Sequence, residues 1–390
     1  MLCVTQWLNI LFITLAKTSI DQKSSVMSYT HKGKALINGM VDPGQVITDA
    51  GELSVTAEDD GTQIGEYVKG DFEWWYFDIY DQAAGFFLKI VLHIGTNPVR
   101  TKVISQLAVS VSTPEGNSSL SFPFNISELS SNSWQCNLSV GDKIRIWTVL
   151  DHPPGYFIKI DIPGFKCDFR FKGELEGWKP FGKNIPYQTG NKRVDLSWVI
   201  PMPKARVEGN FNFEKNKYTL SEGKGYHDHN YIKIDRKNPL YLDDQVNKWY
   251  WGKCFAGSFT VIFMDVWCRV NRTLSLMVAE NDRIIHSSNN QIECSVLSSG
   301  FDNLLKTGYP SSIIIKSLDK EFPFKAEFES EKILDHRDLL EGVNPVIRFL
   351  IRRLVAKPAY HGILAKVRLE IGNQILKGSG NFESMVFRGN

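Results

Sequence analysis

The sequence predicts an all-β protein built from two antiparallel sheets in tandem. From about residue 71 onward, short apolar or alternating runs are separated by Gly, Pro, Asn and Asp, which is typical of antiparallel meanders. The second half of the chain repeats this pattern. A chain of 390 residues is also longer than one compact core usually supports, so two domains are expected. Two β-barrels or sandwiches are the economical arrangement, because closing a sheet removes its exposed edges.

Strands are expected in both halves, wherever β-branched and aromatic residues alternate with polar ones. In the first half the predicted strands cover 85–94, 102–111, 143–151, 155–164, 167–175 and 194–213. In the second half they cover 258–270, 274–281, 311–318, 322–330, 365–372 and 380–387. The polar segment 233–248 holds Pro239 and many charges, and we expect it to be a linker. The resulting division is an N-terminal segment 1–39, a domain 40–232, the linker 233–248 and a domain 249–390.

One short amphipathic helix is expected near the C-terminus. Asn344 can cap this helix, and Pro345 suits its first turn. An apolar stripe is formed by Val346, Ile347, Leu350, Ile351 and Leu354, and the rest of the circumference carries Arg348, Arg352 and Arg353. We expect the helix to pack against the second barrel or to close its mouth. The alternative is a helix that lies on a membrane surface, because its polar side is basic.

The composition limits the classes of function. Hydrophobic residues at 43% and charged residues at 23% are typical of a globular protein. A net charge of +2 gives no support for a nucleic-acid partner. Aromatic residues at 12% are the one excess and suggest wide apolar cores or cavities. The cysteines form no CxxC pair and no zinc-ligand spacing. Some could pair as disulfides, but a fold of this size does not need them, so we expect buried free thiols at Cys3, Cys136, Cys167, Cys254, Cys268 and Cys294.

The N-terminus contains an apolar run of about ten residues, which is too short to span a bilayer. The run is similar to a signal-peptide core, but no Lys or Arg precedes it, which counts against that interpretation. Met27 is an alternative start. Four N-x-S/T sequons do not settle the compartment either, so the sequence leaves the localisation undetermined.

The stretch EGKGYHDHNYIK (222–233) concentrates groups that can do chemistry. On a strand, alternation places His227, His229 and Tyr231 on one face and Tyr226, Asp228 and Asn230 on the other. Two histidines at i and i+2 are a fair start for a metal site, but no third and fourth ligands present themselves nearby, so no metal is expected. Hydrogen bonding to neighbouring backbone is the structural alternative. An acid–base role is favoured, because imidazole titrates near neutrality.

Three further stretches combine aromatic rings with charge. DFEWWYFDIYD (71–81) alternates Glu73, Trp75 and Phe77 with Trp74, Tyr76 and Asp78, and KWYWGK (248–253) places Trp249 and Trp251 on one face. VIFMDVW (261–267) sets Asp265 inside an otherwise apolar run. A buried carboxyl is costly unless it is paired or protonated, so Asp265 is a candidate general acid with a raised pKa.

Taken in order, these stretches closely resemble one known family. The stretches that carry the resemblance are FEWWYFD, PKARVEGNFNF, GKGYHDHNY, WYWGK, FMDV, KPAYHGILAKVRLEI and GNFESMVFR. The resemblance is to motifs of the carotenoid hydratase (hydroxyneurosporene synthase) and AttH-like family. The fungal Diels–Alderases of polyketide pathways are similar too. The resemblance runs from about residue 40 to the C-terminus. It implies two tandem lipocalin-like antiparallel β-barrels, with the HDHN element near the place where they meet.

The resemblance also implies a reaction and its residues. Hydratases of the family add water to an isoprenoid double bond without cofactor or metal, which requires a proton donor, aromatic faces for the carbocation and a base for the water. Matched by motif, Asp265 is the donor and His229 the base or water-orienting partner. The sequence departs from the family at two aromatic positions, with Tyr231 where the family has Trp and Phe263 where it has Tyr. The supporting residues are expected to be His227, Asp228, Asn230, Tyr231, Trp74, Trp75, Tyr76, Trp249, Trp251 and Phe263.

Two other functions remain open on the same scaffold. A pericyclase would fold a polyene into a reactive conformer and polarise its carbonyl with hydrogen-bond donors. A non-catalytic carrier would bind a lipid or isoprenoid unchanged, with the YHDHNY cluster as a hydrogen-bond network between the domains. All three hypotheses predict a hydrophobic small molecule as partner, with no cofactor and no nucleic acid.

Overall fold

The computed structural model describes residues 54–96, 103–189, 191–241, 246–268, 272–341, 343–354 and 357–387. These residues lie in one compact unit, Val41–Asn390. The predictions for the N-terminal segment 1–39, which include the apolar run, Cys3 and Met27, fall outside the described residues.

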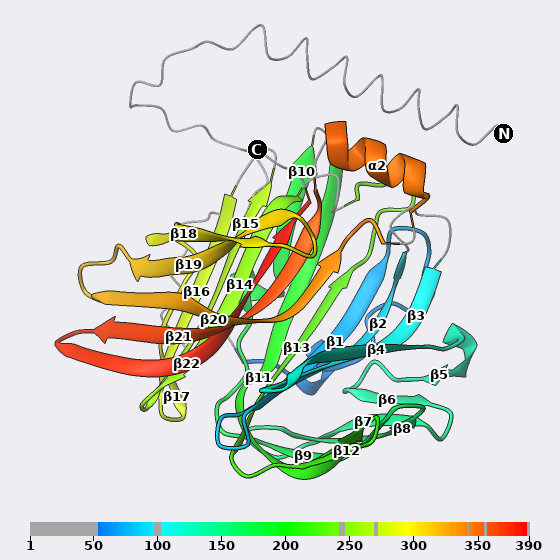
Figure 1. Cartoon of the computed structure of the whole chain (residues 1–390), viewed down its shortest axis with the longest axis horizontal. Coiled ribbons are helices and arrows are strands. Elements are labelled where there is room, and N and C mark those ends of the chain that lie inside the picture. The colour runs from blue at the N-terminus through cyan, green and yellow to red at the C-terminus, as the bar shows by residue number, and fades with distance from the viewer. Residues whose placement is uncertain are drawn as a thin grey trace, which may run out of the picture. The chain divides into compact units, whose positions relative to one another are not determined.

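The first sheet has 13 strands, all paired antiparallel, in the order β4-β3-β2-β1-β13-β11-β9-β8-β7-β6-β5, with β10 and β12 also paired to β11 (Figure 1). Short 3-10 helices η2 (Ala57–Asp60), η3 (Ile126–Glu128) and η4 (Pro180–Lys183) accompany it. The strands are β1 (Phe72–Asp81), β2 (Phe86–Thr96), β3 (Val103–Thr113), β4 (Gly116–Pro123), β5 (Leu129–Ser130), β6 (Asn137–Val140), β7 (Ile144–Val149), β8 (Gly155–Ile162), β9 (Phe165–Gly173), β10 (Asn184–Thr189), β11 (Lys192–Phe213), β12 (Asn216–Thr219) and β13 (Gly223–Ile232).

The second sheet has nine strands in the order β17-β16-β15-β14-β22-β21-β20-β19-β18. They are β14 (Val246–Ala256), β15 (Phe259–Cys268), β16 (Arg272–Glu280), β17 (Arg283–Ser288), β18 (Ile292–Asp302), β19 (Thr307–Ser317), β20 (Phe324–Asp338), β21 (Ala359–Ile371) and β22 (Gln374–Val386). Helix α2 (Pro345–Leu354) stands between β20 and β21. The prediction of an all-β chain with two curled lipocalin-like sheets and one short C-terminal helix is confirmed. The predicted linker 233–248 begins directly after β13, but its last three residues belong to β14, so it was drawn too long; the division into separate domains stays a prediction.

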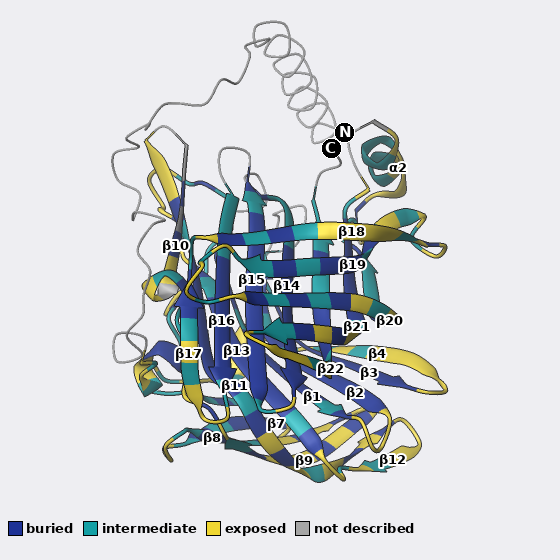
Figure 2. Cartoon of the chain, turned by 90° about the vertical axis from the view of Figure 1, so that its left-hand side faces the viewer, coloured by how far each residue is buried: buried dark blue, intermediate teal, exposed yellow. Residues whose placement is uncertain are grey.

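Three apolar cores hold the structure together, and dark blue in Figure 2 marks their buried residues. The first lies inside the first sheet and includes Phe77, Phe169 and Phe211. The second lies inside the second sheet, around Phe263 and Phe328. The third draws residues from both sheets and forms a layer between them; its members include Tyr76, Trp198 and Tyr226 from the first sheet and Trp251, Ile262 and Met264 from the second.

The layer between the sheets also contains a fully buried ion pair. Lys253 Nζ on β14 lies 2.9 Å from Asp78 Oδ1 on β1, and the two side chains are 1% and 0% exposed. Tyr76 Oη donates to Asp78 Oδ2 at 3.0 Å. Burial raises the pKa of the Asp78 carboxyl, and Lys253 acts against this shift. Charges buried this deeply are tolerated only when each is paired, so the pair joins the two sheets.

Helix α2 begins as the sequence predicts but is covered less than expected. Asn344 caps it, since its Oδ1 accepts from the Val346 backbone N–H at 3.0 Å. The predicted apolar stripe is not fully covered, because Val346 is 67% exposed and Phe349 beside it is 65% exposed. The helix is held to β20 mainly by charge, through Arg348 and Arg352, which both donate to the Asp338 carboxylate.

The five described cysteines are buried and free, which confirms the expectation for Cys136, Cys167, Cys254, Cys268 and Cys294. None of the helices among the described residues has the length and apolar character needed to cross a bilayer.

We expect Lys253→Met to lower the free energy of unfolding by about 3–5 kcal/mol, because it leaves the Asp78 carboxyl buried without its cation. Urea unfolding measures the loss, and adding Asp78→Asn to Lys253→Met should restore most of it. Lys159→Met is the matched control, since Lys159 and its partner Asp168 are 56% and 59% exposed. Its cost should stay below about 1 kcal/mol. Equal costs for the two lysines would contradict a structural role for the buried pair.

Candidate functional site

Strand β13 divides the YHDHNY cluster between two environments, as the alternation predicts. His227 and His229 are fully buried, and their rings stack on Phe77 and Trp75 of the first sheet. The register explains this stacking, because Phe77 stands directly opposite His227 and Trp75 opposite His229 on β1. The alternate residues of β13 face the layer between the sheets, where Tyr226 belongs to the shared core.

Each ring nitrogen of His229 is engaged. Nδ1 lies 3.1 Å from the Asp59 carbonyl, which can only accept, and Nε2 lies 2.9 Å from Glu73 Oε1. Tyr67 Oη also donates to Glu73 at 2.5 Å. Burial alone would lower the pKa of His229, but the hydrogen bond and the charge of Glu73 outweigh it and the pKa is raised. His229 therefore favours its doubly protonated form.

His227 repeats this arrangement with another carboxylate. Its Nδ1 lies 2.9 Å from the Tyr76 carbonyl, and its Nε2 lies 3.0 Å from Asp60 Oδ1. Tyr156 Oη donates to Asp60 Oδ2 at 2.7 Å. His229 Nδ1 also lies 3.8 Å from the same Asp60 Oδ1, so the two histidines together fix η2, which carries Asp59 and Asp60, against β13.

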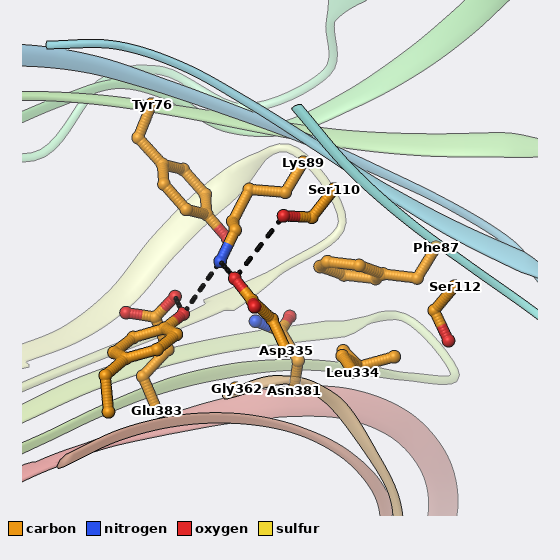
Figure 3. A pocket seen from close by; sticks show the side chains of 11 residues that line it. Tyr76, Phe87, Lys89, Ser110, Ser112, Leu334, Asp335, Gly362, Asn381 and Glu383 are labelled. Atoms are coloured by element: carbon orange, nitrogen blue, oxygen red, sulfur yellow. Dashed lines mark hydrogen bonds and ion pairs between the residues drawn. The ribbon is translucent and has the colours of Figure 1, made fainter. Parts of the chain in front are cut away.

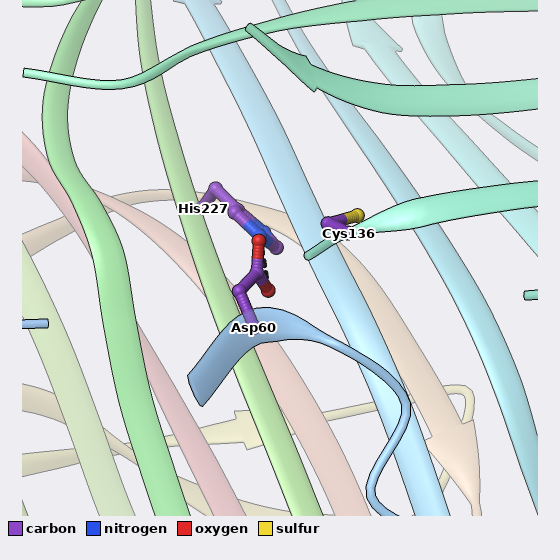
Figure 4. Close-up of side chains that lie close together, drawn as sticks. All are labelled: Asp60, Cys136 and His227. Carbon is purple, nitrogen blue, oxygen red and sulfur yellow. Dashed lines mark hydrogen bonds and ion pairs between the residues drawn. The ribbon is translucent and has the colours of Figure 1, made fainter. Parts of the chain in front are cut away.

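Asp60, Cys136 and His227 each offer a ligand atom, and these atoms lie within 4.8 Å of one another (Figure 4). Both nitrogens of His227 are already hydrogen-bonded, and burial raises the pKa of the Cys136 thiol well above its usual value. Asp60 and His227 are thus already bonded to each other and to their neighbours, and Cys136 is buried beside them in the first core.

A cavity of about 50 Å³ lies in the layer between the sheets, with space for a few water molecules. Its walls come from both sheets: Trp74, Tyr76, Leu196, Trp198, Asp228, Asn230, Trp249, Trp251, Met264 and Glu383. Cross-strand pairing builds these walls. Trp74 and Trp198 both stand opposite Asn230, and on the other sheet Met264 and Glu383 both stand opposite Trp251. Six of the predicted site residues, Trp74, Tyr76, Asp228, Asn230, Trp249 and Trp251, thus line one cavity.

Asp228 is the titratable group at the centre of this wall. Tyr226 Oη and Trp198 Nε1 donate to its Oδ2 at 2.8 and 3.2 Å, and Asn230 Nδ2 donates to its Oδ1 at 2.8 Å. Burial raises the pKa of Asp228 to about 7, against the opposing effect of the donors Tyr226 and Trp198. A carboxyl that titrates near neutrality can give and take a proton at working pH.

Two indole groups in the same cavity have no hydrogen-bond partner among the described residues. They are Nε1 of Trp249 and Nε1 of Trp251, and both nitrogen atoms are buried. Buried donors without partners are rare in folded proteins, and they are satisfied by water or by a ligand. The residues that line the cavity thus include two carboxyl groups, Asp228 and Glu383, and two indole N–H groups without a described partner.

A smaller cavity of about 10 Å³ adjoins the first, since Tyr76 and Glu383 line both (Figure 3). Lys89 lies 2.7 Å from Asp335 and donates to Tyr360 Oη at 3.0 Å, and Tyr360 donates to Glu383 at 2.5 Å. Burial opposes the charge on Asp335, but Lys89 and Arg337 hold its pKa at about 2. Burial raises the pKa of Glu383, which Lys89 only partly counters.

Asp265 lies elsewhere, inside the second sheet. It forms two hydrogen bonds of 2.8 Å with the Arg272 guanidinium and a third, of 3.0 Å, with Trp267 Nε1. Its neighbour Phe263 packs in the same core. Asp265 and His229 therefore face two different cores, and neither lines a described cavity. Their joint action stays a prediction that this geometry does not favour.

Three further residues lie at or near the site: Tyr231, which the sequence analysis predicted, and Trp198 and Glu383, which it did not. Tyr231 is partly buried, with its ring 5.6 Å from that of His229. Sequence reasoning missed Trp198 and Glu383, which stand on β11 and β22. Nothing in the polar and apolar pattern of β22 singles out Glu383, and only the pairing of the strands shows which cavity the two residues share.

No family model matches the sequence. Hydroxyneurosporene dehydrogenase of Chlorobaculum tepidum is 32% identical over 77 residues, which is 18% of this chain and 19% of that protein. The chain thus matches about a fifth of the length of this curated relative.

Solved structures match over most of the chain. An AttH-type protein of Nitrosomonas europaea is 12% identical with a TM-score of 0.58, covering 82% of this chain and 94% of that one. CghA with Sch210972 is 10% identical with a TM-score of 0.55, covering 87% and 98%. Kievitone hydratase of Nectria haematococca is 13% identical with a TM-score of 0.53, covering 86% and 97%. The resemblance drawn from the motifs is confirmed, and at these identities it is the fold that the solved structures share with this chain.

We expect the destabilisation caused by His229→Gln to shrink as the pH rises. A histidine whose pKa is raised on folding stabilises the protein below its unfolded pKa of about 6.5, and this stability is lost as pH passes the folded value. At about pH 6 the variant should lose roughly 3–5 kcal/mol, because Glu73 keeps its burial without its cation. Urea unfolding from acid to alkaline pH gives the comparison. His152→Gln is the control, since the His152 side chain is 85% exposed. A cost of His229→Gln that is constant or grows with pH would refute the charged pair.

Proposed function

We propose that the chain binds a small hydrophobic molecule between its two sheets and protonates a carbon–carbon double bond there, so that water adds to it. The observation that carries the proposal is Asp228, a buried carboxyl with a pKa of about 7 on an aromatic wall. The fold shared with kievitone hydratase is compatible with addition of water, and the partial match to hydroxyneurosporene dehydrogenase, which carries the name of a carotenoid, is compatible with a hydrophobic substrate.

Asp228 has the properties that the first step needs. Its carboxyl proton would pass to one carbon of the double bond, whose π electrons form the new C–H bond and leave a cation on the other carbon. The aromatic faces of Trp74, Trp249 and Trp251 would stabilise that cation where bulk water is excluded. One water then adds, and its surplus proton returns to the Asp228 carboxylate, so the site is regenerated without a further reactant.

The two unpartnered indole N–H groups supply the second requirement. Nε1 of Trp249 and of Trp251 would hold the attacking water or a polar group of the substrate by a hydrogen bond. Glu383, at the junction of the two cavities, would accept a hydrogen bond from the same water. These groups orient the water, while Asp228 moves the proton.

The size of the cavity sets a condition on binding. Ligand pockets usually measure about 300–1,000 Å³, whereas this cavity measures about 50 Å³. The substrate must therefore widen the layer between the sheets as it enters. Trp74 and Trp249 are both partly buried, and their rings are 6.4 Å apart across that layer. Rotation of these two rings is the smallest movement that would admit a ligand.

A second candidate function rests on the same unpartnered donors. In a pericyclase the indole N–H groups would polarise a substrate carbonyl, and Asp228 would not need to transfer a proton. The structural similarity to CghA is compatible with this alternative. A carrier would use the same cavity without any chemical change to its ligand.

We expect Asp228→Asn to reduce hydration at least 100-fold, because general acid catalysis contributes about 10²–10⁴-fold. The purified protein is incubated with a panel of acyclic isoprenoids and polyenes in ¹⁸O-labelled water, and mass spectrometry follows the gain of one labelled water. With the wild type, turnover should fall as pH rises above about 7, since the acid must be protonated.

Two controls make the assay selective. Asp168→Asn changes an exposed carboxyl, 59% accessible, and should leave turnover unchanged. Asp265→Asn examines the alternative pair of Asp265 and His229, and a loss as large as that of Asp228→Asn would favour that pair. An isomerised product without added water, insensitive to Asp228→Asn, would indicate the pericyclase. Substrate that is bound but recovered unchanged would indicate the carrier.

A further inference from the structure

One end of the second sheet carries an exposed surface that combines apolar and basic side chains. On α2, the residues Val346, Phe349 and Arg353 are exposed, and at spacings of three and seven they share one side of the helix. We call this side the α2 face. On β18 and the turn that follows it, the exposed apolar residues are Val296, Leu297, Phe301 and Leu304, which we call the β18 patch.

The two surfaces belong to one end of the molecule. The Arg352 guanidinium donates to the Leu305 carbonyl, and Lys357 Nζ donates to the Lys306 carbonyl at 3.1 Å. These contacts tie the C-terminal end of α2 and Lys357 to the turn that holds Leu304. Figure 2 shows α2 at the same end of the second sheet as the exposed end of β18.

The charge of this region is positive. Helix α2 (PVIRFLIRRL) contains three arginines and no carboxylate. Arg348 and Arg352 share the single carboxylate of Asp338, so the three side chains together keep a positive charge. Arg353, Lys306 and Lys357 are exposed around the apolar residues.

Such exposure has a high cost in water. Phe349 and Leu304 are 65% and 79% exposed, and contiguous exposed apolar side chains mark interaction surfaces. A short helix with apolar residues and arginines on its outer side is the arrangement of helices that lie at the membrane interface. A protein partner of matching shape would need acidic groups around an apolar centre, whereas an anionic lipid surface supplies both properties everywhere.

We propose that the α2 face and the β18 patch dock this protein on a membrane surface that contains anionic lipid. Phe349, Val346 and Leu304 enter the boundary between headgroups and acyl chains, and Arg353, Lys306 and Lys357 lie among the lipid phosphates. The surface gives the protein access to molecules dissolved in the bilayer. This inference does not depend on the proposed reaction, since binding to lipid can be measured without any turnover.

The test is co-sedimentation of the full chain with phosphatidylcholine vesicles and with mixed phosphatidylcholine–phosphatidylserine vesicles. Phe349→Glu combined with Leu304→Glu should weaken binding at least about tenfold, since each change removes a large apolar side chain from the interface. Arg353→Gln should weaken binding to the mixed vesicles about fivefold and leave binding to phosphatidylcholine unchanged. Ile375→Glu is the matched control, an exposed apolar residue at the start of β22, and should have no effect.

Thermal unfolding of each variant checks that the fold is kept. Every variant retains the same N-terminal segment, so any contribution of that segment to vesicle binding is the same in the variants and the wild type. Weaker binding confined to the Phe349→Glu/Leu304→Glu and Arg353→Gln proteins supports the proposal. Equal binding by the wild type and the double variant would overturn it, as would a wild type that binds no vesicles. Self-association of the wild type without vesicle binding, lost in the double variant, would instead assign the surface to a second copy of the chain.

Discussion

A few charged side chains are buried among apolar ones where the two sheets meet, and the rest of the structure depends on how these charges are paired. Each curled sheet fills its own inside with apolar residues, as lipocalin-like sheets generally do. The outer faces then meet, and Asp78, Lys253, Asp228 and Glu383 all lie at or near that contact. Asp78 has its cation, and Asp335 has Lys89 nearby. Asp228 has hydrogen-bond donors but no cation within ion-pair distance among the described residues, and burial raises its pKa to about 7.

The contrast between Asp228 and Asp265 shows that burial alone does not select an acid. Both carboxyls are buried within aromatic strands, and the sequence makes Asp265 the more conspicuous because it interrupts an apolar run. Arg272 reaches Asp265 from the next strand and forms a bidentate pair, which is a typical structural use of a buried carboxylate. Asp228 receives only neutral donors, so the cost of desolvation appears as a raised pKa.

Much of the fold could be predicted from local patterns, whereas the site could not. The predicted runs 85–94 and 258–270 correspond to β2 and β15, and the Asn344 cap is where the sequence places it, because alternation and capping depend on neighbours in the chain. The alternation of β13 also correctly separates His229 from Asp228. It cannot show that Glu73 and Asp59 occupy both nitrogens of His229, since these partners lie about 160 residues away in the chain. Glu383 was missed for the same reason, because only the pairing of β22 with β14 brings it to the cavity.

The two histidine–carboxylate pairs have a consequence for the opposite face of the strand that carries them. Side chains of a strand alternate, so a shift of β13 by one residue would move His227 and His229 out of the first core and bring Asp228 into it. The pairs with Asp60 and Glu73 form only in the observed register, in which Trp75 stands opposite His229. The histidine–carboxylate pairs take no part in the cavity, but they fix the register of β13 and thereby the position of Asp228 in the cavity wall. A substitution that breaks either histidine pair would therefore displace the Asp228 carboxyl, even though no side chain that lines the cavity had changed.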